Sequence, residues 1–118
     1  MRVTSLWADQ AGHVDPRPPL ERDLDADVVV VGAGYSGLWT AYYLLGLRPD
    51  WRVVVLEREH VGFGASGRNG GWAVGEFANH DAPIDQLRAA FDAVTEIGRV
   101  CAAEGIDADY RRGGTVRL

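Results

Sequence analysis

Four consecutive valines, Val28 to Val31, run directly into the glycine turn of DVVVVGAGYSGLWTAYYLL. An uninterrupted valine run is typical of a strand that is buried on both faces of a parallel sheet. Helical periodicity follows the turn, and after Pro49 comes a second apolar run, WRVVVLE, which ends at Glu57. A strand, a helix and a second strand in this order form one βαβ unit over residues 26–57. The sequence therefore predicts an α/β fold, a Rossmann-like βαβ unit with a parallel sheet.

The turn between the first strand and the helix has the spacing G-x-G-x-x-G, given by Gly32, Gly34 and Gly37. The first glycine permits a tight turn, the second lets a diphosphate approach the main chain, and the third lets the helix pack closely on the strand. The amide groups and the positive dipole end at the start of the helix favour an anion. We therefore expect a dinucleotide to bind at the six turn residues Gly32, Ala33, Gly34, Tyr35, Ser36 and Gly37. The alternative is a tight turn that binds no ligand.

Glu57 stands about twenty residues after Gly37, where dinucleotide-binding proteins place an acid that accepts hydrogen bonds from the adenosine ribose. A carboxylate at this position repels a 2′-phosphate, so NADP is disfavoured. The alternative for Glu57 is a solvated acid at the end of a strand, because Arg58 and Glu59 beside it are also charged.

Composition narrows the class of partner. The chain has 118 residues, enough for a single domain, with a net charge of −5 and no run of Lys or Arg, so we expect no nucleic acid and no anionic membrane as partner. The N-terminus lacks the apolar core of a signal peptide, and no apolar stretch is long enough to span a membrane. The single Cys101 fits a reducing compartment, and the cytoplasm is the expected location. The three histidines, His13, His60 and His80, have no paired spacing, so no metal site is predicted.

Prolines set the N-terminus apart from the rest of the chain. Pro16, Pro18 and Pro19 predict an extended arm over residues 1–25, rather than a helix or strand, with Trp7 as its anchor. Residues 26–118 then form the dinucleotide-binding part of the chain.

A long amphipathic helix is predicted after Pro83, which suits its first turn, and Gly105 suits its end. Apolar residues recur there at intervals of three and four, so they share one buried face: Ile84, Leu87, Phe91, Val94, Ile97 and Cys101. The tail YRRGGTVRL predicts a glycine turn followed by the start of a strand.

Between these elements, the segment from Gly62 to Gly75 is rich in glycine and has no periodicity. Such a segment lets main chain lie against a flat ligand, which favours a flavin over a nicotinamide. Together, VVVVGAGYSGLWTAYYL, VVVLERE and GFGASGRNGG resemble the FAD-dependent oxidoreductases of the D-amino-acid-oxidase type, the superfamily of glycine oxidase and sarcosine oxidase. The nearest likeness is to γ-glutamylputrescine oxidoreductase-like proteins.

The resemblance implies FAD as the cofactor and makes residues 26–118 the N-terminal part of an FAD-binding domain. The turn glycines would hold the FAD pyrophosphate, Glu57 would bind the adenosine ribose, and Arg58 would flank the adenine. The following segment would run past the pyrophosphate and the flavin ring, with Ala65 at its start, polar contacts from Ser66, Arg68 and Asn69, and Gly70 and Gly71 close to the isoalloxazine. Trp72 departs from the family pattern and either shields the flavin or is a core aromatic.

The resemblance also implies the chemistry, which is removal of hydride from a C–N bond with the flavin as acceptor. The substrate would be a small-molecule amine or amino acid. No residue of this chain presents itself as a catalytic base, and the tyrosines of the first helix are explained by packing.

The resemblance reaches only the N-terminal part of the family's fold, so we expect a Rossmann-like fold that is incomplete at its C-terminus. Three interpretations follow. The first is an FAD-dependent oxidoreductase represented by its N-terminal portion. The second is a non-catalytic remnant or stand-alone dinucleotide-binding module, and the third is a NAD-binding subunit completed by a separate chain. In the first interpretation, the chain alone holds the AMP and pyrophosphate half of FAD weakly and catalyses nothing.

Overall fold

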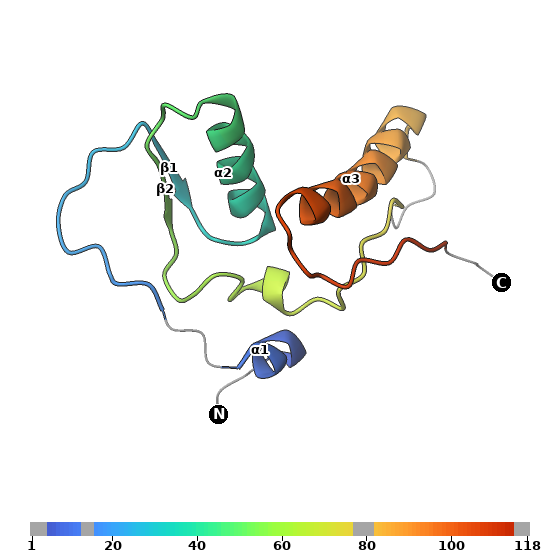
Figure 1. Ribbon diagram of the computed structural model, residues 1–118, viewed down its shortest axis with the longest axis horizontal. Coiled ribbons are helices and arrows are strands. Elements are labelled where there is room, and N and C mark those ends of the chain that lie inside the picture. The colour runs from blue at the N-terminus through green and yellow to red at the C-terminus, as the bar shows by residue number, and fades with distance from the viewer. Residues whose placement is uncertain (1–4, 13–15, 77–81, 115–118) are drawn as a thin grey trace. The chain divides into compact units, whose positions relative to one another are not determined.

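The computed structural model describes residues 5–12, 16–76 and 82–114 (Figure 1). The chain divides into two compact units, Met1–Gly70 and Gly71–Leu118, and each is described by itself. In chain order the elements are α1 (Leu6–Ala11), β1 (Val28–Val31), α2 (Tyr35–Leu47), β2 (Val53–Leu56), the single 3₁₀ turn η1 (Ala65–Gly67) and α3 (Ile84–Ala103).

The first unit is built around the β1–α2–β2 unit that the sequence predicts. Strands β1 and β2 are parallel, and their register pairs Val28 with Val53 and Val31 with Leu56. Helix α2 joins them and packs on the sheet (Figure 1). Ala41 of α2 is 7 % exposed, so a small residue does face the sheet one turn after Gly37. The predicted Rossmann-like α/β fold with a parallel sheet is confirmed.

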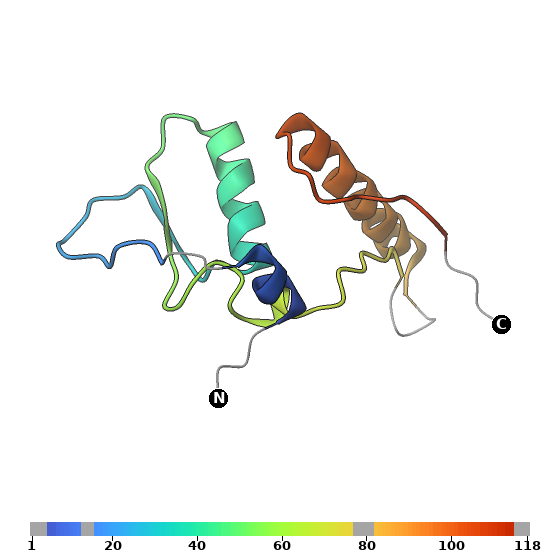
Figure 2. The same ribbon diagram turned by 60° about the horizontal axis from the view of Figure 1, so that its bottom comes forward.

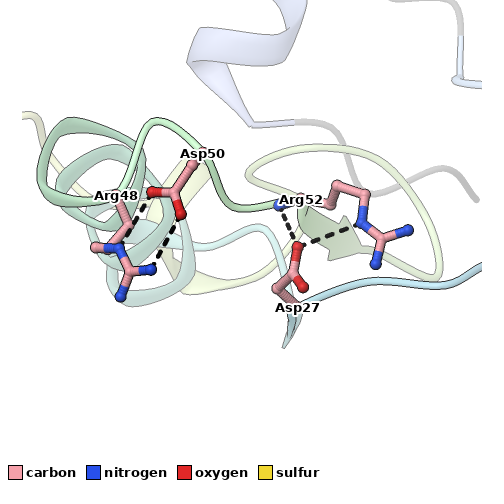
Figure 3. Close-up of polar contacts among 4 residues, drawn as sticks. All are labelled: Asp27, Arg48, Asp50 and Arg52. Atoms are coloured by element: carbon pink, nitrogen blue, oxygen red, sulfur yellow. Dashed lines mark hydrogen bonds and ion pairs between the residues drawn. The ribbon is translucent and has the colours of Figure 1, made fainter.

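An ion pair fastens the two strands where they begin (Figure 3). The Asp27 carboxylate accepts hydrogen bonds from the Arg52 amide at 2.7 Å and from Arg52 Nε at 3.3 Å. In return the Arg52 carbonyl accepts a bond from the Asp27 amide at 3.1 Å. The Arg52 amide, and after it the guanidinium, hold the pKa of Asp27 below its usual value. The register of the sheet is therefore set by a side chain as well as by the strand ladder.

Within the described residues of the first unit only one face of β1 is covered, which corrects the expectation of burial on both faces. Val28 and Val30 are half-buried, whereas Val29 is 51 % and Val31 is 85 % exposed. The alternation arises because successive side chains of a strand point to opposite faces, and α2 lies on the face of Val30.

The N-terminal arm contains a short helix, which corrects the expectation that residues 1–25 are extended throughout. The Ser5 side chain accepts a hydrogen bond from the Ala8 amide at 3.1 Å, and Gly12 ends α1 with a φ of 74°. Ser5 is a good N-cap, and the prolines that argued against a helix begin only at Pro16, beyond its end. Residues 16–25 form no helix or strand. The boundary at residue 25 stays a prediction.

In the second unit, α3 confirms the predicted helix, but Ile84 and Phe91 of the expected buried face are 64 % and 55 % exposed. Pro83 is its N-cap, and Gly105, with a φ of 64°, follows its end. The buried residue is Val100 at 6 % exposure, and Cys101, expected on the buried face, is only half-buried. The tail folds back on α3 at Gly98, where the Tyr110 ring lies and its hydroxyl donates to the Val94 carbonyl at 2.9 Å.

The segments on either side of α3, around Gly75 and over residues 110–114, form neither helix nor strand. Gly75 is buried against Phe91, whose ring would be 2.6 Å from a Cβ at that position. The strand start predicted for the tail falls on residues 115–118, outside the described residues. Within the described part of the chain, no helix is long and apolar enough to cross a membrane.

Candidate cofactor site

The turn after β1 can only be built with glycine at two of its positions. Gly32 has a φ of 101°, a conformation that side chains disfavour, and its amide donates to the Leu56 carbonyl at 2.7 Å. A Cβ on Gly37 would overlap the Gly32 carbonyl oxygen and lie 3.3 Å from the Val30 side chain. The first and third glycines of the motif therefore do what their spacing predicts, because they make the tight turn and the close contact of helix with strand.

The start of α2 presents amide groups at the second glycine of the motif. Gly34 is the N-cap and has no side chain to cap the helix. The next amide, of Tyr35, donates instead to Ser66 Oγ at 2.9 Å, from a segment 31 residues further along the chain. The amides of Ser36 and Gly37 belong to the first helical turn, where an α-helix has no acceptor of its own. Amides and a hydroxyl thus converge at the positive end of the α2 dipole.

The Glu57 carboxylate lies beside this turn, at the carboxyl end of β2. It accepts a hydrogen bond from the Ala33 amide at 2.9 Å and another from the Glu59 amide at 3.0 Å. These two amides, the first above all, hold the pKa of Glu57 below its ordinary value. Glu57 is therefore ionised at neutral pH and held next to the glycine turn. It is exposed, as expected of a strand-end acid, but its contact with Ala33 argues against simple solvation.

A second glycine turn, Gly62 to Gly67, lies against the first. Its residues GFGASG share the pattern G-x-G-x-S-G with the GAGYSG of the first turn. Gly62 has a φ of 74°, and a Cβ on Gly67 would overlap the Gly62 carbonyl oxygen, as one on Gly37 would overlap that of Gly32. The Gly62 amide donates to the Ala33 carbonyl at 2.9 Å. The two turns thus repeat one local geometry and are joined through their main chains.

The second turn brings Ser66 and Asn69 to the start of α2. A Cβ on Gly34 would lie 3.0 Å from Ser66 Oγ, so a side chain at position 34 would displace the serine. Asn69 Nδ2 donates to the Tyr35 hydroxyl at 3.0 Å and to the Ser66 carbonyl at 2.6 Å. The structure therefore gathers five of the predicted site residues around one helix start: Gly34, Tyr35, Glu57, Ser66 and Asn69.

Sequence reasoning missed one residue of this cluster. Trp7, expected to anchor the arm, donates its indole N–H to the Asn69 carbonyl at 2.6 Å. The anchoring role agrees with the expectation, but the partner could not be found, because 62 residues separate the two positions and no periodicity connects them.

Other predicted residues lie at the margin of the cluster. Arg58 forms an ion pair with Glu59 at 3.1 Å and its side chain is 86 % exposed. Arg68 lies over the Phe63 ring, 4.8 Å from its centroid. Ala65 begins η1, and Gly70 is exposed at the end of the first unit.

Gly71 and Trp72 belong to the second unit. Gly71 has a φ of 71°, which suits a glycine. Trp72 is 75 % exposed, so its interpretation as a core aromatic is wrong for this chain.

The described residues hold no group of three His, Cys, Asp or Glu that could bind a metal ion. His60 contacts the neighbouring Val61 carbonyl and the Phe63 ring, and His13 and His80 lie outside the described residues.

A parallel βαβ unit with this glycine turn and an acid at the end of its second strand defines a dinucleotide-binding protein of the Rossmann class. Within that class, residues 27–118 match the family described as FAD dependent oxidoreductase, and the chain belongs to this family. The predicted resemblance to the D-amino-acid-oxidase type is confirmed, and FAD is the cofactor of the family.

Curated relatives agree with the family. The chain is 36 % identical to gamma-glutamylputrescine oxidoreductase of Escherichia coli over 95 % of its own length and 28 % of the relative's. It is 44 % identical to the probable oxidoreductase OrdL of Haemophilus influenzae, over 64 % of this chain and 17 % of that protein. It is 41 % identical to sarcosine oxidase subunit beta of Rhizobium meliloti, over 58 % of this chain and 15 % of that protein. The chain thus spans less than a third of the relatives it matches. No solved structure matches it.

Proposed function

We propose that this chain forms the FAD-binding portion of an oxidoreductase that removes hydride from a C–N bond of a small amine or amino acid. The observation that carries the proposal is the junction of the two glycine turns, where helix amides, Ser66 Oγ and the Glu57 carboxylate converge. The names of two relatives, gamma-glutamylputrescine oxidoreductase and sarcosine oxidase subunit beta, support the substrate class.

The hydrogen-bonding groups of the candidate site fit the two parts of an adenosine diphosphate group, which are the diphosphate and the ribose. Amides at a helix start bind a diphosphate without a dedicated cation, and a side chain at Gly34 would press on Ser66 Oγ, which accepts from the first of these amides. An ionised carboxylate is acceptor-only, and two hydroxyls of a ribose are donors that suit it. Glu57, already oriented by the Ala33 amide, would accept them.

When bound, the flavin supplies the hydride acceptor, and the protein supplies binding, orientation and electrostatics. We assign the turn residues Gly32 to Gly37 and Ser66 to the pyrophosphate, and Arg58 to the adenine. Arg68, Asn69, Gly70 and Gly71 are assigned to the flavin side of the cofactor. We also propose a cytoplasmic location, because a single cysteine fits a reducing compartment. A separate chain could complete the active site, since one relative is a subunit by name.

The test is to titrate the full 118-residue chain with FAD and to record the flavin spectrum before and after desalting. The wild-type chain is expected to bind FAD more tightly in the titration, and to retain more of it, than Gly34→Val, because the valine side chain would displace Ser66 and cover the helix amides. Gly46→Val is the matched control, since Gly46 lies in α2 with nothing within 4 Å of its Cβ position. Equal retention by the wild type and Gly34→Val would place the cofactor elsewhere, and stronger binding of NAD than of FAD would favour the nicotinamide alternative.

A further inference from the structure

The short helix α1 has little to hold it in place by itself. It has six residues, none of them buried, and isolated helices of that length are unstable in water. A hydrogen bond from the Trp7 indole to the Asn69 carbonyl connects it to a distant segment, and Trp7 itself is 41 % exposed. Figure 2 shows α1, in dark blue, beside the yellow-green turn η1. The contact is thus made with the segment assigned to the cofactor.

The acceptor of this bond is main chain, and its position matters. The Asn69 carbonyl belongs to the peptide unit that joins Asn69 to Gly70, and two glycines follow. Glycine has the widest backbone freedom of any residue, so this peptide unit is the part of the segment least able to fix its own orientation. A hydrogen bond of 2.6 Å to its carbonyl oxygen restrains it and also orients the Gly70 amide on its other side.

The restraint continues through the Asn69 side chain to the glycine turn. Its carboxamide donates to the Tyr35 hydroxyl and to the Ser66 carbonyl, and Ser66 Oγ accepts from the Tyr35 amide. A connected series of hydrogen bonds therefore links α1, the segment after η1 and the first residue of α2. Every bond in it ends on a residue of the candidate site.

We propose that Trp7 is a positioning residue for the cofactor site: its indole N–H fixes the Asn69–Gly70 peptide and so holds residues 65–70 against the start of α2. This inference rests on the proposed function for the identity of the cofactor, but the holding of the loop does not depend on FAD. Helix α1 then restrains the loop of the candidate site through this one contact.

The test compares Trp7→Phe, which keeps an aromatic ring and removes the N–H, with the wild-type chain. Trp51→Phe is the matched control, because Trp51 lies under the Arg48 guanidinium between α2 and β2. Trypsin cleavage after Arg68, followed by mass spectrometry, reports the order of the loop without FAD, and cleavage after Arg111 and Arg112 in the second unit serves as the internal reference. The urea midpoint, the FAD dissociation constant and the visible circular dichroism of bound flavin complete the measurement.

Trp7→Phe is expected to raise cleavage after Arg68 and to weaken FAD binding, each about two- to tenfold, the range that one neutral hydrogen bond gives. The visible dichroism of the bound flavin changes, while the reference cleavages stay as in the wild type and in Trp51→Phe. Unchanged cleavage after Arg68, or equal changes in both variants, would overturn the proposal. Raised cleavage at every site with a lower urea midpoint would overturn it too, because Trp7 would then be merely structural.

The outcomes separate this inference from the proposed function. If no variant and no wild-type chain binds FAD, the proposed function fails, and cleavage after Arg68 alone decides whether Trp7 holds the loop. If the wild-type chain binds FAD and Trp7→Phe binds it equally well with the same dichroism, the proposed function stands and the positioning role is wrong.

Discussion

At the scale of single residues, the candidate site is made of main-chain groups that a few side chains hold in place. Ser66 supplies to α2 the cap that Gly34 lacks, and Glu57 accepts the amide of Ala33. Both side chains come from segments well beyond the turn in sequence. Because Gly34 has no side chain to cap the helix, the support for the turn comes from these two segments.

Glu57 gives the site a dependence on pH whose sign follows from its contacts. The Ala33 and Glu59 amides lower the pKa of Glu57 in the folded chain, from an ordinary value of 4.5. A carboxyl whose folded pKa is depressed contributes stability that is present above the unfolded pKa and is lost as the pH falls through the folded one. We expect Glu57→Gln to be less stable than the wild type at pH 7, with the difference shrinking below about pH 4.

Urea unfolding of the two chains between pH 7 and pH 3 measures this difference directly. Other carboxylates, Asp27 among them, titrate in both chains and cancel in the comparison. A difference that is constant over this range would mean that the Glu57 charge has no part in holding the turn.

At the scale of elements, the two glycine turns act as one joint between α2 and η1. The main chains meet at the Gly62 amide and the Ala33 carbonyl, and each turn closes on its own glycine pair. Two positions within the second turn differ in the space around them. A Cβ at Gly67 would overlap the Gly62 carbonyl, whereas one at Gly64 would meet nothing within 4 Å.

We expect Gly67→Ala to lower the free energy of unfolding by about 1–3 kcal/mol, since the Gly62 carbonyl must shift to make room. Gly64→Ala is expected to change it by less than about 0.5 kcal/mol. Urea denaturation followed by circular dichroism gives both values. Equal effects of the two alanines would show that the second turn does not depend on the close contact.

The sequence predicted those elements whose residues carry their own pattern. The valine run with its glycine turn located β1 and α2, and apolar spacing located α3, because local periodicity reports the face that packs. It missed α1, whose six residues have no apolar stripe and whose start depends on one capping serine. It placed Glu57 and Ser66 in the site but not their partners, since contacts across 24 and 31 residues leave no local pattern.

At the scale of the whole molecule, the uncovered face of the sheet is the main feature. Val29 and Val31 lie on it at 51 % and 85 % exposure, opposite the face on which α2 packs. A parallel sheet in a doubly wound fold is normally covered on both faces, and the chain spans 28 % of gamma-glutamylputrescine oxidoreductase. The valine run is therefore suited to a buried environment that the described residues of the first unit provide on one side only.

The two faces of β1 should respond differently to the same change of side chain. Val→Thr keeps the shape and replaces one methyl group by a hydroxyl, which is costly where it is buried without a partner and harmless where water reaches it. Val30→Thr, on the face next to Gly37, is expected to lower the free energy of unfolding by about 1 kcal/mol. Val31→Thr is expected to change it by less than about 0.5 kcal/mol and to reduce the binding of a dye specific for exposed apolar surface. If instead Val31→Thr were the more destabilising substitution and left dye binding unchanged, the outer face of β1 would be covered in solution, and a second copy of the chain would be the first occupant to test by sedimentation.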